Sequence, residues 1–315
     1  MEFPWNHKRR YNALTNYFQN KFGERIQKLS VNAGFSCPNR DGTINVNGCS
    51  YCNNNAFNPS YCSPEKSISQ QIEEGIQFHT NRYRRAGRYL AYFQTYSNTF
   101  ADINILKSKY EEALQCPDII GLVIGTRPDC IDDEKLDYLK ELSEKYFVSI
   151  EYGVESCYNK TLEKINRGHT FEQSVKAIEE TAKRNLHNGI HLVFGLPGES
   201  REEMLEEANI ISKLPVTVVK FHQLQIIKDT AMVDDYKMNP EKYFIFNLDE
   251  YIDFIIDFIE RLNPEILIER FTAEVPPRFL VKGGFGLLRT DQILQRIEKR
   301  IEDRNTWQGR LFKHQ

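Results

Sequence analysis

Residues 190–204, IHLVFGLPGESREEM, contain a complete strand–turn–helix unit. The apolar run over 190–195 predicts a strand. A turn containing glycine and proline follows it. Ser200 and Glu203 then have the spacing of a capping box, in which two side chains satisfy free N–H groups at the start of a helix. A strand joined directly to a helix predicts an α/β protein.

The same unit recurs along the chain. Repeated strand–helix units imply parallel strands joined by right-handed crossovers. The candidate architectures are therefore a doubly wound sheet and a full or partial (β/α) barrel. The predicted strands are 27–32, 89–94, 119–125, 148–153, 190–195, 216–222 and 266–271. Further capping boxes begin at Ser67 and Thr170, and helices are expected near 102–115, 133–145, 249–262 and from Asp291 onward.

Unusual polar motifs follow most of these strands, and they favour the barrel. Barrel enzymes build their sites at the carboxyl ends of the strands, where the loops converge. An open sheet also sends such loops to one edge, so both architectures remain candidates. The motifs are GFSCPNRDG (34–42), TYSNT (95–99), GTRPD (125–129), EYGVES (151–156) and GLPGE (195–199).

The length of 315 residues allows one large barrel with small extensions, or two ordinary domains. No stretch of 18 apolar residues occurs, so no membrane span is predicted. The N-terminus is basic but lacks the apolar segment and cleavage site of a secretory signal. We therefore expect a cytoplasmic protein.

The net charge of −3 excludes a polycation, yet basic residues are concentrated in two segments. Such segments either contact a polyanion such as nucleic acid or form ordinary solvated surface. Charge alone favours ordinary surface. Residues 1–30 contain six Lys or Arg against two acids, a balance of +4 that includes Arg9 and Arg10, and residues 81–90 contain Arg82, Arg84, Arg85 and Arg88 with no acid.

Three of the seven cysteines lie close together after the first predicted strand. Cys37, Cys49 and Cys52 have C-x11-C-x2-C spacing. Thiolates suit iron–sulfur clusters, and three ligands to a four-iron cluster leave one iron open. Cys62 supplies a fourth thiol, so the spacing alone equally allows a structural zinc site. We interpret Cys62 as a bystander, and the odd count argues against a disulfide framework.

Seven motifs in series resemble the radical S-adenosylmethionine (SAM) superfamily, and more narrowly its YtqA/YhcC-like family, which is related to the elongator catalytic subunit. Tyr51 matches the aromatic residue that precedes the last cluster cysteine, although x11 replaces the usual x3 spacing. The resemblance favours an iron–sulfur cluster over zinc. The motifs are GFSCPNRDG, GCSYCNN, AYFQTYSNT, IGTRPDC, EYGVES, INRGHT and HLVFGLPGES.

The resemblance implies a partial (β/α)6 TIM-like barrel over 27–275, with a basic N-terminal extension at 1–26 and a C-terminal extension at 276–315. It also implies a [4Fe–4S] cluster on Cys37, Cys49 and Cys52, with SAM on the open iron. An electron from a donor such as flavodoxin or ferredoxin then cleaves SAM to a 5′-deoxyadenosyl radical. The cofactors supply this chemistry, while the protein supplies position and electrostatics.

Residue roles follow from the same resemblance. Arg167 is expected to pair with the SAM carboxylate, because a guanidinium matches a carboxylate in two parallel bonds. Glu155 is expected at the ribose hydroxyls. The glycine-glycine-glutamate motif that many members use for the SAM amino group is absent. The remaining expected SAM contacts are Tyr51, the residues in place of that motif (Gln94, Ser97 and Asn98), His191 at the ribose, and Gly195, Leu196 and Pro197 at the adenine.

The resemblance also implies a substrate, the wobble uridine of tRNA, whose carboxymethylaminomethyl side chain becomes aminomethyl. One alternative is a radical SAM enzyme acting on a small metabolite or peptide. Another is a zinc-stabilised binding protein without enzymatic activity. The expected substrate contacts are Arg127, Asp129, His222 and Gln225 in the cavity, and Arg9, Arg10, Arg84 and Arg85 on RNA; Arg127 and Asp129 have the alternative of pairing with each other.

Overall fold

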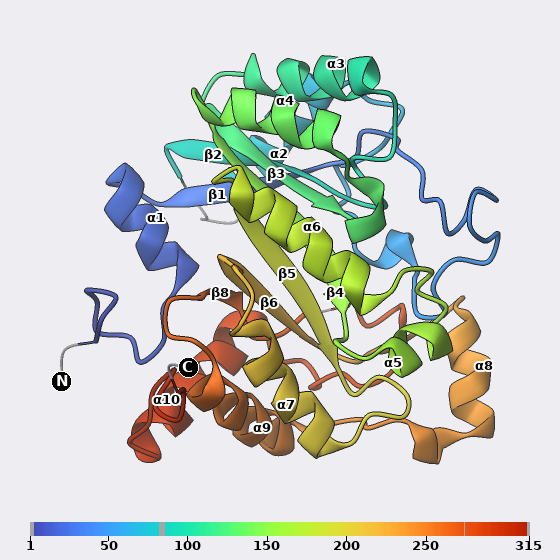
Figure 1. Ribbon diagram of the computed structural model, residues 1–315, viewed down its shortest axis with the longest axis vertical. Helices are drawn as coiled ribbons and strands as arrows, with labels where there is room; N and C mark the ends of the chain where they lie inside the picture. The colour runs from blue at the N-terminus through green and yellow to red at the C-terminus, as the bar shows by residue number, and fades with distance from the viewer. Residues whose placement is uncertain (1–2, 82–85, 274, 314–315) are drawn as a thin grey trace.

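Seven parallel strands form one curled sheet in the computed structural model, which describes residues 3–81, 86–273 and 275–313 (Figure 1). The strand order follows the chain without a reversal, whereas a doubly wound sheet requires one. The predicted partial barrel and all seven predicted strands are confirmed, and the seventh strand extends the expected six-unit barrel. The strands in spatial order are β1 (Ile26–Val31), β2 (Arg88–Phe93), β3 (Ile119–Thr126), β4 (Phe147–Glu155), β5 (His187–Phe194), β6 (Val218–Gln223) and β8 (Leu267–Arg270).

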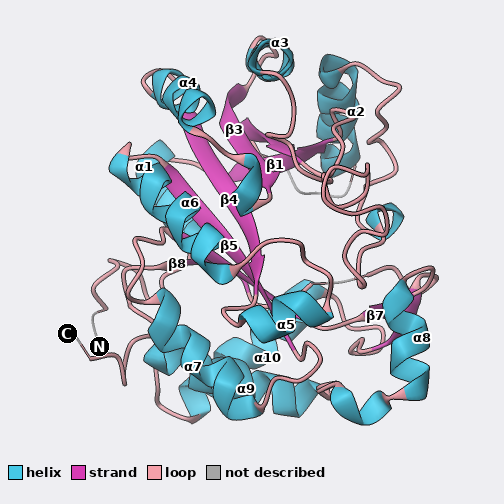
Figure 2. Ribbon diagram, turned by 45° about the vertical axis from the view of Figure 1, so that its right-hand side comes forward, coloured by secondary structure: helices cyan, strands magenta, loops and turns pink. Residues whose placement is uncertain are grey.

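Helices that follow the strands cover the outer face of the sheet (Figures 1 and 2). In β2, Tyr89, Ala91 and Phe93 pack beneath them, while Leu90 and Tyr92 face the barrel interior. The covering helices are α2 (Ile68–Thr80), α3 (Ile103–Leu114), α4 (Asp133–Ser143), α6 (Phe171–Lys183), α7 (Arg201–Ile211) and α9 (Leu248–Arg261). Short 3-10 turns occur at Asn54–Ala56, Pro128–Cys130 and Pro240–Lys242.

The capping boxes at Thr170 and Ser200 are confirmed. The box at Ser67 is only half formed. The Ser67 side chain accepts from the backbone N–H of Gln70, but the Gln70 side chain donates to Glu74 instead of reaching back. A nearby carboxylate therefore competes successfully for this amide.

Helix α1 (Leu14–Phe22) closes the amino end of the barrel. Leu14 and Phe18 are buried against Leu90, Val123 and Leu267, which come from three different strands. Figure 1 shows α1 at the opposite end of the sheet from α5 (Asn159–Lys164) and α8 (Ala231–Met238). The carboxyl ends of the strands are thus left to build a site.

The two edges of the barrel sheet, β1 and β8, do not pair with each other. Ala13 forms a parallel bridge with Ile268, so the N-terminal segment lies along the free edge of β8. A small second sheet joins β7 (Ile226–Ile227) to β9 (Leu280–Lys282) in antiparallel fashion. Sequence patterns did not predict it, because strands this short have no readable periodicity.

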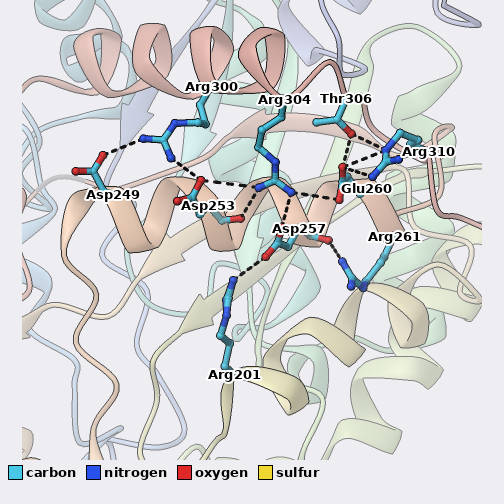
Figure 3. Close-up of polar contacts among 10 residues, drawn as sticks. All are labelled: Arg201, Asp249, Asp253, Asp257, Glu260, Arg261, Arg300, Arg304, Thr306 and Arg310. Atoms are coloured by element: carbon cyan, nitrogen blue, oxygen red, sulfur yellow. Dashed lines mark hydrogen bonds and ion pairs between the residues drawn. The ribbon is translucent and has the colours of Figure 1, made fainter.

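The predicted C-terminal helix is α10 (Thr290–Asp303), and it packs on α9. Its isoleucine stripe is buried, while arginines of the helix and of the segment after it pair with acids of α9 (Figure 3). Within the helix, Arg300 pairs with Asp249 and Asp253; beyond it, Arg304 pairs with Asp257 and Arg310 with Glu260. Across the described ranges, no helix has the length and apolar character needed to cross a membrane.

Candidate active site

The three clustered cysteines lie in the loop that follows β1, at the carboxyl end of the barrel. Cys37 and Cys49 are buried and Cys52 is half-buried. Burial raises the pKa of the Cys52 thiol to about 11, and the neighbouring Cys49 and Cys37 thiols add to this effect. Cys37 and Cys49 therefore both lie within electrostatic reach of the Cys52 thiol.

Cys62 lies apart from this group. Its thiol donates to the Ser30 carbonyl at 3.0 Å, and its charged neighbours are Lys66 and Glu74. Within residues 3–81, 86–273 and 275–313, no three His, Cys, Asp or Glu side chains converge tightly enough to hold one metal ion. Cys62 is therefore held by contacts of its own, outside the group formed by Cys37, Cys49 and Cys52.

Backbone and amide contacts fix the cysteine loop against the segment after α5. The Asn39 amide donates to the Asn166 carbonyl at 2.6 Å, and the Asn166 amide donates to the Gly48 carbonyl at 2.7 Å. Gly48 has φ +72°, and a Cβ there would lie 2.7 Å from the Arg40 side chain. Glycine is thus required one residue before Cys49.

Arg167 reaches from this segment into the cysteine group. Its Nη1 lies 3.5 Å from the Cys49 sulfur, and its Nη2 donates to the Gly153 carbonyl at 2.6 Å and lies 3.5 Å from Glu155. Burial alone would lower the pKa of Arg167, but Tyr51, Cys49 and Glu155 raise it well above its usual value. The guanidinium is charged and buried, and its Nε has no partner among the described residues.

Arg127 and Asp129 pair with each other, which was one of the two alternatives considered for them. Arg127 donates to both Asp129 oxygens, at 2.8 and 2.7 Å, and also to the Arg167 carbonyl at 2.7 Å. The pair therefore supports the Arg167 backbone. His169 packs beside it, and burial together with the Arg167 charge lowers the His169 pKa to about 2. Sequence reasoning assigned His169 no role.

Of the residues in place of the glycine-glycine-glutamate motif, Ser97 and Asn98 are buried at this end and Gln94 is half-buried. Gln94 donates to the Ser30 hydroxyl at 2.7 Å, and Asn98 donates to the Thr95 and Gly125 carbonyls. Ser97 is fully buried. Buried atoms without a partner in the described part of the chain include Asn39 Oδ1, Thr95 Oγ1 and Asn98 Oδ1. Each costs about 1–3 kcal/mol when left unpaired, so these atoms fit a site for polar cofactors.

The expected adenine segment packs next to Tyr51. Leu196 is fully buried and shares an apolar cluster with Leu162 and Tyr51. Pro197 is buried beside it, and the Gly195 N–H points to the Met204 sulfur at 3.1 Å. The structure thus brings Tyr51, Leu196 and the α5 segment together.

Below this site, four charged side chains form a closed ring inside the barrel, which we call the charged ring: Lys28, Glu151, Lys220 and Glu269. Lys28 lies 2.6 Å from Glu151 and 2.5 Å from Glu269. Lys220 lies 2.5 Å from Glu151 and 3.1 Å from Glu269. Burial would raise the Glu151 pKa, but Lys220 and Lys28 hold it well below its usual value. Sequence reasoning assigned no role to these residues, because they come from four separate strands.

His191 belongs to the same interior. Its Nε2 lies 3.1 Å from Glu151, and its ring stacks on His222 at 5.4 Å. Both rings therefore have protein partners within the barrel. Gln225 is buried just beyond β6.

Two of the four predicted RNA-contacting arginines bind the protein's own C-terminal region. Arg9 lies 3.5 Å from Glu298, and Arg10 donates to the Asn305 side chain and the Thr306 carbonyl. The other two, Arg84 and Arg85, lie outside the described residues.

Comparisons with known proteins agree with this geometry. The family model of the radical SAM superfamily matches residues 40–211, and that of the radical SAM C-terminal domain matches residues 216–303. YtqA of Bacillus subtilis is 32% identical over 98% of this chain and 95% of its own length. YhcC of Escherichia coli is 36% identical over 87% of this chain and 89% of its own length.

Two more distant proteins share part of the chain or its fold. The tRNA uridine(34) acetyltransferase of Methanocaldococcus jannaschii is 27% identical over 52% of this chain and 30% of its own length. The solved structure of Methanocaldococcus infernus Elp3, lacking residues 1–46, has a TM-score of 0.66 at 17% identity, covering 90% of this chain and 64% of that one. This last likeness supports the partial-barrel fold.

The superfamily match covers more than half of the chain, and the expected cofactors, a [4Fe–4S] cluster and SAM, are confirmed as those of this family. The thiols, the charged Arg167 and the unpartnered polar atoms at the strand ends fit both of them. The chain is a radical SAM superfamily enzyme and belongs to the family that includes YtqA and YhcC.

Proposed function

We propose that this enzyme binds its cluster through Cys37, Cys49 and Cys52 and modifies the wobble uridine of tRNA, converting a carboxymethylaminomethyl side chain to aminomethyl. The observation that carries the cofactor part of the proposal is the contact of the buried Arg167 guanidinium with Cys49, beside two further thiols. A fixed cation beside the cluster ligands is placed to hold an acidic cofactor group.

The chain's own side chains then have distinct tasks. Arg167 binds the SAM carboxylate, with the Arg127–Asp129 pair holding its backbone in place. Glu155, 3.5 Å from Arg167, accepts from the ribose hydroxyls. The segment 195–197 and Tyr51 contact the adenine. Gln94, Ser97 and Asn98 contact the SAM amino group. The bound cluster and SAM together supply a 5′-deoxyadenosyl radical.

The proposal of tRNA as substrate is supported by the similarity to the tRNA uridine(34) acetyltransferase. Arg9 and Arg10 are engaged by the C-terminal region, and Arg88 pairs with Glu24, so Arg84 and Arg85 remain as the proposed basic contacts with RNA. We further propose a cytoplasmic location and an electron donor of the flavodoxin or ferredoxin type.

The test uses anaerobically reconstituted protein, dithionite and SAM, with and without tRNA that bears the carboxymethylaminomethyl group. We expect 5′-deoxyadenosine in both reactions, with a rise when tRNA is present, and aminomethyluridine in the digested tRNA by mass spectrometry. A Cys37/Cys49/Cys52→Ala variant removes both products, and Cys62→Ala is the matched control that retains them.

Two results would overturn parts of the proposal. If the nucleoside is unchanged while 5′-deoxyadenosine forms, the substrate is wrong and the cofactor chemistry stands. If tRNA affinity does not fall as salt rises, phosphate contacts are absent and RNA is not the ligand.

A further inference from the structure

Arg270 is directed into the barrel by an irregularity at the end of β8. Val219 pairs with Ile268 and the next residue, Lys220, pairs with Arg270, so two residues of β8 occupy one step of β6. Such bulges re-aim side chains and are common beside active sites. Glu269 thereby reaches the charged ring while the adjacent Arg270 reaches His222.

The Arg270 guanidinium has no carboxylate partner within residues 3–81, 86–273 and 275–313. Its Nη2 lies 3.0 and 3.3 Å from the two ring nitrogens of His222, and its Nε is buried without a partner. Burial and the Arg270 charge hold the His222 pKa well below its usual value, so the ring is neutral. The two lysines and two glutamates of the charged ring cancel, which leaves one uncompensated positive charge in this wall of the barrel.

A cavity of about 150 Å³ adjoins Arg270 at the open edge of the barrel. Its other charged lining residues are already engaged: Glu269 with the two lysines, Arg9 with Glu298, and Asp291 with Arg289 at 3.4 Å. Tyr11 and Thr272 also line it. The cavity therefore offers a single unused charge, together with space beside it.

We propose that Arg270 and this cavity form a binding site for a carboxylate of the substrate, separate from Arg167. The single net charge matches a monoanion, and a guanidinium fork matches the planar geometry of a carboxylate. A phosphodiester is the poorer fit, because its linked nucleosides need space on both sides of the anion. This assignment rests on the proposed function, because the carboxymethyl group of the wobble uridine is the carboxylate that the site binds.

The test has two arms, both with the SAM-saturated holoenzyme so that Arg167 is occupied. The first compares binding of two anticodon stem-loop RNAs, one with carboxymethylaminomethyluridine and one with aminomethyluridine. Charge-assisted hydrogen bonds of about 1.5–3 kcal/mol predict a preference of roughly 10- to 100-fold for the carboxylated RNA. The second arm detects free acetate by saturation-transfer NMR.

In Arg270→Gln, the RNA preference should fall below about threefold and the acetate signal should disappear, with an unchanged circular dichroism spectrum. Arg270→Lys keeps the positive charge but lacks the planar guanidinium, so it should retain part of the RNA preference and part of the acetate signal. Arg25→Gln removes an exposed arginine near the start of β1 and should change neither.

Each outcome decides between the two proposals. If RNA fails to bind but acetate binds through Arg270, the tRNA proposal falls and the carboxylate site stands. If the carboxylated and aminomethyl RNAs bind equally, the carboxylate site is refuted while the tRNA proposal survives. If acetate fails to bind the wild type, or binds equally to Arg270→Gln, the carboxylate site is overturned.

Discussion

Replacing Glu151 with Gln should destabilise the protein strongly, because it unbalances the charged ring. Glu151 is 2% exposed and contacts Lys220, Lys28 and His191 at 2.5, 2.6 and 3.1 Å. Without its charge, two ammonium groups share the single carboxylate of Glu269. Removing one partner of a buried ion pair costs about 3–5 kcal/mol, so we expect a loss in that range in the free energy of unfolding. Anaerobic urea titration followed by circular dichroism measures it.

The control for this prediction is Glu269→Gln, which removes a carboxylate of the same ring that is 17% exposed and should therefore cost less. Adding Lys220→Met to Glu151→Gln removes the ammonium group that lost its carboxylate partner. The double variant should therefore recover part of the lost free energy of unfolding. The depressed Glu151 pKa stabilises the folded state fully above the unfolded value of about 4.3, and this contribution is lost as pH falls through the lower folded value. The difference in the free energy of unfolding between the wild type and Glu151→Gln should thus become smaller below about pH 4. A loss under 1 kcal/mol at pH 7 would refute the reasoning.

Three further outcomes are expected. Cys52→Ala should abolish binding of about four iron atoms per chain, measured with sulfide after anaerobic reconstitution, whereas Cys62→Ala should retain them; equal iron in both variants would contradict the ligand assignment. Glu260→Gln should cost about 1–3 kcal/mol in urea, because the buried carboxylate holds Arg310 at 2.8 Å and joins the C-terminal segment to α9 (Figure 3); a loss within the error of the titration would show that this contact is dispensable. Gly195→Ala should lower the melting temperature by several degrees, since φ is +100° and the added Cβ would lie 2.2 Å from the Phe244 carbonyl; an unchanged melting temperature would mean that the loop relaxes freely.

The strands and most helices could be predicted because their signals are local. Apolar runs of four to eight residues and capping spacings such as Ser200–Glu203 depend only on neighbouring residues. The antiparallel pair β7–β9 could not be predicted, since its two- and three-residue strands are joined across more than 50 positions. The boundaries at 26 and 275 stay predictions.

The sequence identified candidate site residues that lie within motifs. It did not identify residues whose role depends on contacts between strands distant in the chain. Arg167 follows from its motif, and its approach to Cys49 adds a geometric reason for its role. The charged ring and Arg270 went unassigned, because each residue taken alone is an ordinary charge in a strand. The sequence allowed Arg127 and Asp129 either a substrate role or a mutual pair, and only their 2.7–2.8 Å contacts distinguish the two.

The sequence by itself determined the α/β class, the parallel strands and the cysteine loop with its spacing, because period, turn chemistry and motif order are properties of adjacent residues. The tertiary structure alone decided that the sheet curls without reversing, that Cys62 stands apart from the other three thiols, and that lysines and glutamates from four strands meet inside the barrel. These features arise from the register between strands distant in the chain. Burial removes water from these charged groups, so each one is stabilised only by the partners that the fold places beside it.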